Sequence, residues 1–264
     1  MMIITSDIHI SSSKGAPELL QEIERAALSD PRKTMIVAGD VTCGAKSKEY
    51  MKAYAWFEGL IRQGVNVVIA PGNHDTSQSI LIMRIPIDKG YRRYKYMIDM
   101  IADQDIVLAR RDQFDMISII GKDVFFAARS THHRVHKATR IKRKQFEWAA
   151  RTLLCNGLTS SNGYRLHLVT HQSLWKLPGD KHEHMNRRKR LVKEFLEPFG
   201  FVTAINGHNH GFASGMRKVK KKLPFKIYHI QAPTASEHKT KGGRCTPGYV
   251  KWDPENPGSE KLII

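Results

Sequence analysis

Short apolar runs alternate with segments of helical periodicity along most of this chain. The runs predict β-strands, and the first three are apolar at nearly every position, which is typical of strands buried on both faces of a sheet. The predicted strands are Met2–Thr5, Thr34–Ala38, Asn66–Ala70, Ile106–Leu108, Met116–Ile120, Val124–Ala128, Arg165–Thr170, Phe201–Ile205, Phe225–Ile230 and Gly248–Trp252.

Helices are predicted between these strands, where apolar residues recur at helical spacing. The apolar positions are Leu19, Leu20, Ile23, Ala26 and Ala27; then Met51, Tyr54, Phe57, Leu60 and Ile61; then the ranges 94–101, 144–155 and 191–196. The alternation of strand and helix predicts an α/β fold with parallel early strands, whose functional groups gather where the strands end. We find no internal repeat or linker in the sequence and therefore expect a single domain over residues 1–264.

The composition is that of a globular protein, with 264 residues of which 41% are hydrophobic and 8% aromatic. No apolar run approaches the ~20 residues that a membrane helix needs, so we expect no membrane association. The chain opens directly on a predicted strand, and we expect no signal peptide before it. The three cysteines, Cys43, Cys155 and Cys245, show no paired spacing, which favours a reduced, cytoplasmic setting.

The charge is strongly positive, with 43 Lys and Arg residues against 25 Asp and Glu residues and a formal net charge of +18. Three tracts are dense in basic residues, namely Lys137–Lys144, Arg187–Arg190 and Arg217–Lys222. Such a field favours a polyanionic substrate or partner. The alternative is that each tract is an ordinary solvated face.

Polar residues that can bind metals follow five of the predicted strands. The segments are Asp7-Ile8-His9, Gly39-Asp40, Gly72-Asn73-His74-Asp75, His171 and Gly207-His208-Asn209-His210. Taken singly, each is more often a turn or a buried histidine. Five such segments in order, each at a strand end, instead predict a site for two divalent cations.

The spacing within the segments suggests how the side chains meet. Alternate side chains of an extended segment share a face, so Asp7 and His9 are expected to bind one cation together. By the same argument His208 and His210 both reach inward. Asp40 can bridge two cations through its two oxygens, and Asn73 offers a neutral amide oxygen.

The series D-x-H, GD, GNHD, H and GHxH resembles that of the calcineurin-like metallophosphoesterase superfamily, over Asp7 to His210. The resemblance implies a four-layer αββα sandwich of two mixed β-sheets flanked by helices. It also implies that one metal is held by Asp7, His9, Asp40 and His210, and the other by Asp40, Asn73, His171 and His208.

Departures from the motifs of individual subfamilies indicate which subfamily this chain resembles most. The protein serine/threonine phosphatases continue the GD motif with Asp-Arg-Gly and carry Glu where this chain has Asp75. The purple acid phosphatases carry a metal-binding Tyr where this chain has Cys43. More of the chain is similar to the class III cyclic nucleotide phosphodiesterases, since Gln145–Trp148 resembles their QLxWL helix. His171, however, lacks the following His and Pro of that group.

The expected chemistry is hydrolysis of a phosphodiester by a hydroxide that bridges two metals. His74 is the candidate general acid, oriented by Asp75 or another carboxylate. The alternative for His74 is a hydrogen-bonding partner of the ligands without a proton role. The mixed oxygen and nitrogen ligands suit Mn²⁺, Fe or Zn²⁺. Arg129, His132, His133 and Arg134 are candidate substrate contacts, with a plain basic loop as the alternative.

The function predicted from the sequence is therefore a dinuclear metal-dependent phosphodiesterase acting on a nucleotide or cyclic nucleotide substrate. A nuclease of the same superfamily is the main alternative, favoured by the net charge of +18. A phosphomonoesterase and a non-catalytic interaction module are further alternatives. The latter is disfavoured because every candidate ligand and His74 are present. The sequence leaves the oligomeric state open.

Overall fold

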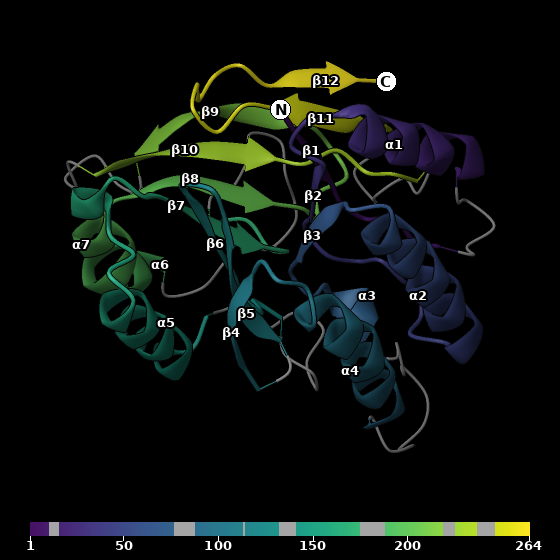
Figure 1. Ribbon diagram of the computed structural model, residues 1–264, viewed down its shortest axis with the longest axis horizontal. Helices are drawn as coiled ribbons and strands as arrows, with labels where there is room; N and C mark the ends of the chain where they lie inside the picture. Colours follow the sequence, from purple (N-terminus) through teal and green to yellow (C-terminus); the bar gives the residue numbers. More distant parts are fainter. Residues whose placement is uncertain are drawn as a thin grey trace.

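The computed structural model describes residues 1–10, 16–76, 88–112, 114–131, 141–174, 188–218, 225–236 and 246–264. Two β-sheets pack face to face, and helices cover the outer face of each (Figure 1). The strand orders are β12-β11-β1-β2-β3 and β4-β5-β6-β7-β8-β10-β9. The predicted fold class, an αββα sandwich of two mixed sheets, is confirmed.

The first sheet has a parallel centre. Strands β1 (Met2–Thr5), β2 (Thr34–Val37) and β3 (Asn66–Ile69) run parallel, and their registers align Thr5 with Val37 and Val37 with Ile69. Strands β11 (Tyr249–Trp252) and β12 (Lys261–Ile263) extend the sheet antiparallel beyond β1. The carboxyl ends of β1, β2 and β3 therefore meet at one edge.

The second sheet also has parallel strands at its centre. These are β6 (Asp123–Ala127), β7 (Arg165–Thr170), β8 (Phe201–Asn206) and β10 (Lys226–Gln231). Antiparallel strands complete it: β4 (Val107–Arg111), β5 (Asp115–Ile120) and β9 (Ala213–Lys218). The ends of β7 and β8 align through the pairing of Thr170 with Asn206.

The helices divide into two outer layers. Helices α1 (Pro17–Ser29), α2 (Ser47–Arg62) and α4 (Asp88–Ala102) pack on the first sheet. Helices α5 (Arg143–Cys155) and α6 (Arg188–Leu191), with the π-helical turn Val192–Leu196, pack on the second sheet; α7 (Glu197–Phe199) follows directly. Two shorter elements are α3 (Asn73–Thr76) and the 3₁₀ turn Ser160–Asn162. Within the described residues, we find no helix with both the length and the hydrophobicity needed to cross a bilayer.

The central strands are apolar at consecutive positions because both of their faces are covered. In β2, Met35 and Val37 contribute to the layer under α1 and α2, whereas Ile36 lies in the layer between the sheets. Successive side chains of a strand point to opposite faces, so each strand supplies both layers. The apolar runs of the sequence therefore mark strands that neither face exposes to water.

Two features of the structure differ from the predicted elements. Strands β9 and β12 were not predicted; β9 begins at Ala213 and runs into the basic tract, where its apolar pattern is weak. In α2 the buried stripe is Tyr50, Ala53, Phe57 and Leu60, whereas Met51 and Tyr54 are exposed. The helical spacing was right, but two positions assigned to the apolar face lie outside the core.

A buried ion-pair cluster lies at the opposite ends of the strands from the metal-binding segments. The Asp123 carboxylate, 1% exposed, contacts the Arg165 guanidinium at 2.7 Å and 2.9 Å and His167 Nε2 at 3.0 Å. Arg32 reaches it from the other sheet at 3.3 Å. Burial alone would raise the pKa of Asp123, but His167 and Arg165 outweigh burial and lower it.

We expect Asp123→Asn to lower the free energy of unfolding at pH 7 by about 1–3 kcal/mol, because it removes the buried carboxylate that pairs with the partly buried Arg165 and Arg32 guanidiniums. A depressed carboxyl pKa contributes stability above the unfolded value near 3.9, and this contribution disappears as the pH falls through the folded pKa. The variant should therefore lose less stability on acidification than the parent. Urea unfolding across this pH range measures both effects. Asp253→Asn, which removes a partly exposed partner of Arg32, should cost less than about 1 kcal/mol.

Candidate metal centre

The five segments that carry the candidate metal ligands meet at one edge of the sandwich. Asp7, Asp40 and Asn73 follow the aligned ends of β1, β2 and β3, while His171 and His208 follow β7 and β8. Backbone hydrogen bonds join the segments: the Asp7 amide donates to the Gly39 carbonyl at 2.9 Å and the His9 amide to the Asp40 carbonyl at 3.1 Å. Residues far apart in sequence thus come together because parallel strands end at a common edge.

Left-handed backbone conformations aim the side chains. The φ angles are 49° at Asp7, 47° at His9, 53° at Asp40, 74° at His208 and 54° at His210. Non-glycine residues adopt this region at a cost of roughly 1–2 kcal/mol each. The expectation that Asp7 and His9 share a face of an extended segment is therefore wrong in its geometry. The side chains do converge, but through two strained residues instead of through strand alternation, and such strain clusters at functional sites.

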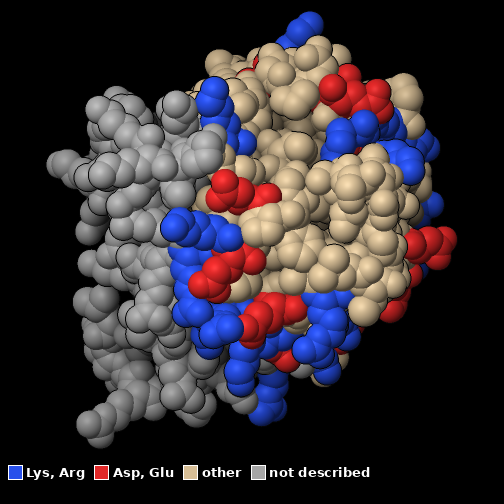
Figure 2. Space-filling view, turned by 90° about the vertical axis from the view of Figure 1, so that its left-hand side faces the viewer, with Lys and Arg blue, Asp and Glu red and all other residues tan. Residues whose placement is uncertain are grey.

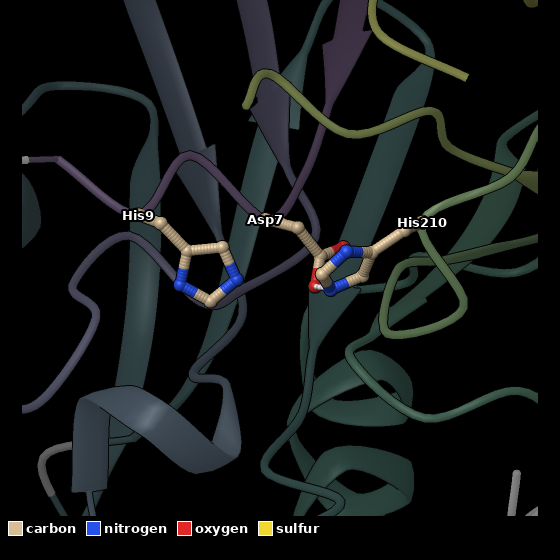
Figure 3. Close-up of side chains that lie close together, drawn as sticks. All are labelled: Asp7, His9 and His210. Carbon is tan, nitrogen blue, oxygen red and sulfur yellow. Dashed lines mark ion pairs between the residues drawn. The ribbon is translucent and has the colours of Figure 1, made fainter. Parts of the chain in front are cut away.

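The first ligand group consists of Asp7, His9 and His210, whose potential ligand atoms all lie within 4.8 Å of one another. His210 Nε2 is 3.1 Å from Asp7 Oδ1, and the His208 amide donates to Asp7 Oδ2 at 2.9 Å. Figure 3 shows the carboxylate against the His210 ring, with the His9 ring on its other side. Burial lowers the pKa of His9 to about 4, which keeps this imidazole neutral and able to bind a metal.

The second ligand group consists of Asp40, His171 and His208, again within 4.8 Å of one another. His171 Nε2 lies 3.1 Å from Asp40 Oδ2 and 3.2 Å from His208 Nδ1. Asn73 joins this group, because its Oδ1 is 3.0 Å from His171 Nε2. The residues of the two groups are those of the two implied ligand sets, except that Asp40 lies in the second group alone; that they bind metal stays a prediction.

The surroundings of His171 fit a cation. Its Nδ1 is 2.8 Å from the Ala38 carbonyl oxygen, which can only accept, so Nδ1 carries a proton. In the neutral ring, Nε2 then presents a lone pair to Asp40 and Asn73 oxygens, which are also acceptors. Burial alone would lower the pKa of His171, but the Asp40 carboxylate raises it to about 9. The environment thus favours positive charge at this point, which a metal ion would supply.

Glycines in the motifs leave room for the carboxylate. A Cβ at Gly72 would overlap the carboxylate and amide nitrogen of Asp40. Gly39 has a φ of 88°, and a Cβ there would lie 2.7 Å from His171 Nδ1. Both glycines are therefore required by packing around the candidate ligands, and Gly39 also by its left-handed backbone conformation.

We expect Gly72→Ala to displace the Asp40 carboxylate and to abolish metal binding at the second group, at a folding cost of about 1–3 kcal/mol from overpacking. Metal content by mass spectrometry and thermal unfolding measure the two effects. Gly59→Ala is the matched control, since a Cβ at this helical position meets no atom within 4 Å. That variant should keep its metal and gain about 0.5–1 kcal/mol of stability. Full metal content in Gly72→Ala would contradict the packing argument.

His74 and Asp75 lie beside the second ligand group in α3. His74 Nδ1 is 2.6 Å from the Cys43 carbonyl oxygen, and the rings of His74 and His9 are 5.1 Å apart. The Asp75 carboxylate accepts instead from the amides of Gly72 at 2.9 Å and Thr42 at 2.8 Å. The structure thus places a carbonyl oxygen, and not the expected carboxylate, at His74 Nδ1. Asp75 instead holds the loop that carries His74, through its hydrogen bonds to the Gly72 and Thr42 amides.

The Asp75 carboxyl titrates unusually high for an aspartate. Burial, followed by the nearby Asp40 carboxylate, raises its pKa to about 6. The Tyr50 hydroxyl donates to the Asp75 carbonyl oxygen, which ties α3 to helix α2. The turn around His74 is thereby held from both sides.

Of the four candidate substrate contacts, the described residues include only Arg129. Its guanidinium lies over the Phe114 ring at 4.4 Å, and its amide donates to Asp115 Oδ1 at 2.9 Å. His132, His133 and Arg134 lie outside the described residues. The substrate role of this segment stays a prediction.

Acidic side chains pair with some of the basic residues in the part of the basic tracts that the structure describes. On α5, Arg143 pairs with Glu147, and Arg190 on α6 pairs with Glu194 at 2.7 Å. Figure 2 shows acidic side chains among the basic ones over this side of the molecule. The described part of this side is therefore mixed in charge and not uniformly positive.

Sequence reasoning missed two residues that support the ligands. Gln172 Nε2 lies 3.5 Å from Asn73 Oδ1, and the Ser130 hydroxyl donates to Gln172 Oε1. The backbone amide of Gln172 in turn donates to Ser130 Oγ at 3.1 Å. Such partners orient the ligands of a metal site. Only its position next to His171 marks Gln172 in the sequence, since its partner Ser130 is distant in the chain.

Two mixed sheets with paired groups of Asp and His at their common edge define a metal-dependent phosphoesterase. The chain belongs to the calcineurin-like phosphoesterase family, whose sequence model matches residues 2–212. The family predicted from the motifs is thereby confirmed. A comparison with curated protein sequences finds no match.

Solved structures show the same fold at low sequence identity. A dimetal phosphatase from Danio rerio has a TM-score of 0.56 at 12% identity, over 94% of this chain and 91% of that chain. A purple acid phosphatase from yellow lupin (Lupinus luteus) seeds has a TM-score of 0.61 at 14% identity, over 94% of this chain and 48% of that chain. This chain thus spans about half the length of the lupin enzyme. PhoD, at 9% identity, has a TM-score of 0.55 over 89% and 56%.

Proposed function

We propose that this protein is a dinuclear metal-dependent phosphodiesterase that hydrolyses a nucleotide-type phosphodiester. The observation that carries the proposal is the adjacency of two groups, Asp7-His9-His210 and Asp40-His171-His208, at one sheet edge. They are joined by the His208 amide, which donates to Asp7 at 2.9 Å.

We propose that the first cation is held by Asp7, His9 and His210, and the second by His171, His208 and the Asn73 amide oxygen, with Asp40 between them. Nitrogen and oxygen donors without thiolate suit Mn²⁺, Fe or Zn²⁺. When bound, two such ions lower the pKa of a coordinated water and neutralise phosphate charge. The carbonyl of Ala38 holds the His171 ring in the tautomer that presents Nε2.

His74 is the proposed general acid. Its Nδ1 lies against the Cys43 carbonyl oxygen, so Nε2 is the nitrogen that can deliver a proton to the leaving oxygen. Asp75 positions this residue through the amides of Gly72 and Thr42. The hydrogen bond at Nδ1 would thus orient the ring, and Nε2 would donate the proton.

The preference for a diester rests on sequence features. Gln145–Trp148 resembles the corresponding helix of the class III phosphodiesterases, and Cys43 replaces the tyrosine of the purple acid phosphatases. The net charge of +18 favours a polyanionic substrate, which makes a nuclease of the same family the second candidate.

The test is a substrate panel: bis-p-nitrophenyl phosphate, p-nitrophenyl phosphate, cyclic mononucleotides and single-stranded DNA, each with Mn²⁺ and with chelator. We expect chelator-sensitive hydrolysis of bis-p-nitrophenyl phosphate in preference to the monoester. Faster hydrolysis of the monoester would overturn the phosphodiesterase assignment. Cleavage of DNA that weakens steeply with salt would favour the nuclease.

A further inference from the structure

A groove lies between helices α2 and α4, which run side by side in Figure 1. Its volume is about 300 Å³, and it is lined by Ser47, Tyr50, Met51, Tyr54, Arg93, Tyr96 and Met97. Met51 is 73% exposed, Tyr96 71% and Tyr54 37%. These large side chains lie at the surface, and packing in the core does not explain their position.

The groove is bordered by basic residues. Lys48 is exposed on α2 one turn before Met51, and Arg92 is exposed on α4 one turn before Tyr96. Acidic groups nearby are engaged in the fold: Glu49 accepts from the backbone amides of Gly44 and Lys46, and Asp99 pairs with Arg110. A groove of aromatic rings with a basic border has the charge that an anionic chain requires.

The groove adjoins the loop of the proposed general acid. Tyr50, which lines it, donates to the Asp75 carbonyl oxygen. Arg93 donates from Nη1 to the Ala45 carbonyl oxygen at 2.9 Å, two residues beyond Cys43, whose own carbonyl contacts His74. Two residues that line the groove are therefore hydrogen-bonded to the segments that hold His74.

We propose that this groove binds single-stranded nucleic acid, with bases stacked on Tyr54 and Tyr96 and phosphates near Lys48. The proposal rests on the second candidate of the proposed function, the nuclease, and assigns the groove as the surface that holds its substrate strand. Aromatic rings bind bases with little sequence preference because every base has a π face. A volume of about 300 Å³ is at the lower end of ligand pockets, which suits a base better than a bulky ligand.

The experiment measures the affinity of the purified protein for a labelled oligothymidylate with phosphorothioate linkages, which resist hydrolysis. An abasic strand of equal length and charge is the comparison. We expect Tyr54→Ala and Tyr96→Ala each to weaken oligothymidylate binding about tenfold and to leave abasic binding unchanged. Tyr54→Phe and Tyr96→Phe keep the ring and should bind as the parent does.

Matched variants test the separate contributions. Leu154→Ala removes an apolar side chain, 62% exposed, from α5 on the other helical layer and should change neither affinity. Lys48→Gln should weaken the binding of both strands and reduce the salt dependence of binding, whereas Lys52→Gln, on another face of α2, should change both less. Because the two tyrosines are exposed, circular dichroism and thermal unfolding should match the parent.

Three results would overturn the proposal: parental affinity in both Tyr→Ala variants, an equal loss for the abasic strand, or polyglutamate binding as tight as that of oligothymidylate. The last result would assign the groove to an acidic protein partner. Binding is measured without turnover, so an absence of phosphodiester hydrolysis would remove the proposed function and leave the binding result to be judged by itself.

Discussion

Asp40→Asn is expected to abolish metal-dependent hydrolysis and to leave the protein folded. The variant keeps the shape of the side chain but removes the charge that faces His171 at 3.1 Å. Metal affinity should fall by more than the about 100-fold that losing an outer hydrogen-bonding partner of a ligand can cost. Metal content and kcat/KM for bis-p-nitrophenyl phosphate measure the two losses.

The same substitution has a second, independent signature. Asp40 is the main cause of the raised pKa of His171, against the opposing effect of burial. In metal-free protein, Asp40→Asn should therefore lower the pKa of His171 from about 9, which NMR titration of the ring can follow. If the pKa of His171 falls and metal binding is lost, the loss of metal is due to the missing charge of Asp40 and not to unfolding.

Asp115→Asn is the matched control for Asp40→Asn. Asp115 is also a buried carboxylate, and it accepts from the Arg129 amide and Gln145 Nε2, both at 2.9 Å, outside the two ligand groups. We expect this variant to keep its metal content. Equal activity in Asp40→Asn and the parent would contradict the metal centre itself.

His74→Ala is expected to slow hydrolysis of a substrate with a poor leaving group by about 10²–10⁴-fold, the range typical of a lost proton donor. An alkyl or nucleoside alkoxide needs a proton as it leaves, whereas p-nitrophenolate does not. The loss on bis-p-nitrophenyl phosphate should therefore be much smaller. Metal content should be unchanged, because His74 lies outside both ligand groups.

Asp75→Asn provides the comparison for His74→Ala. Its amide oxygen can still accept from one of the two amides that the carboxylate holds, so the loop should loosen but His74 remains. We expect a smaller loss, and one that also falls mainly on poor leaving groups. If His74→Ala slowed both classes of substrate equally, the role of proton donor would be excluded and a purely supporting role would remain.

Much of the fold was predictable because its signals are local. The consecutive apolar positions of β1, β2 and β3 reflect burial on both faces, and the spacing of Phe57 and Leu60 reflects a helix. Strands β9 and β12 escaped prediction because their pattern depends on partners: β9 pairs with β10, although none of its side chains from 213 to 216, the part whose burial is described, is buried.

The convergence of the candidate ligands was predictable because metal chemistry restricts residue types, and the motifs occur in order at strand ends. Their binding of metal stays a prediction. The backbone conformation that brings these side chains together was not predictable. Asp7 and His9 both adopt left-handed conformations, which local sequence disfavours outside glycine and which only surrounding contacts sustain. The partner of His74 Nδ1 was likewise hidden, because a backbone carbonyl such as that of Cys43 has no signature in sequence.

The sequence by itself determined the family, the layer order and the identity of the seven candidate ligands. The tertiary structure decided that Asp40 lies with His171 and His208, and which backbone groups orient the candidate ligands. It also left Met51, Tyr54 and Tyr96 on a groove at the surface, outside the core. The physical reason is range: periodicity and residue chemistry are properties of neighbours in the chain, whereas the contact of Asp7 with His210 exists only once distant strands have paired.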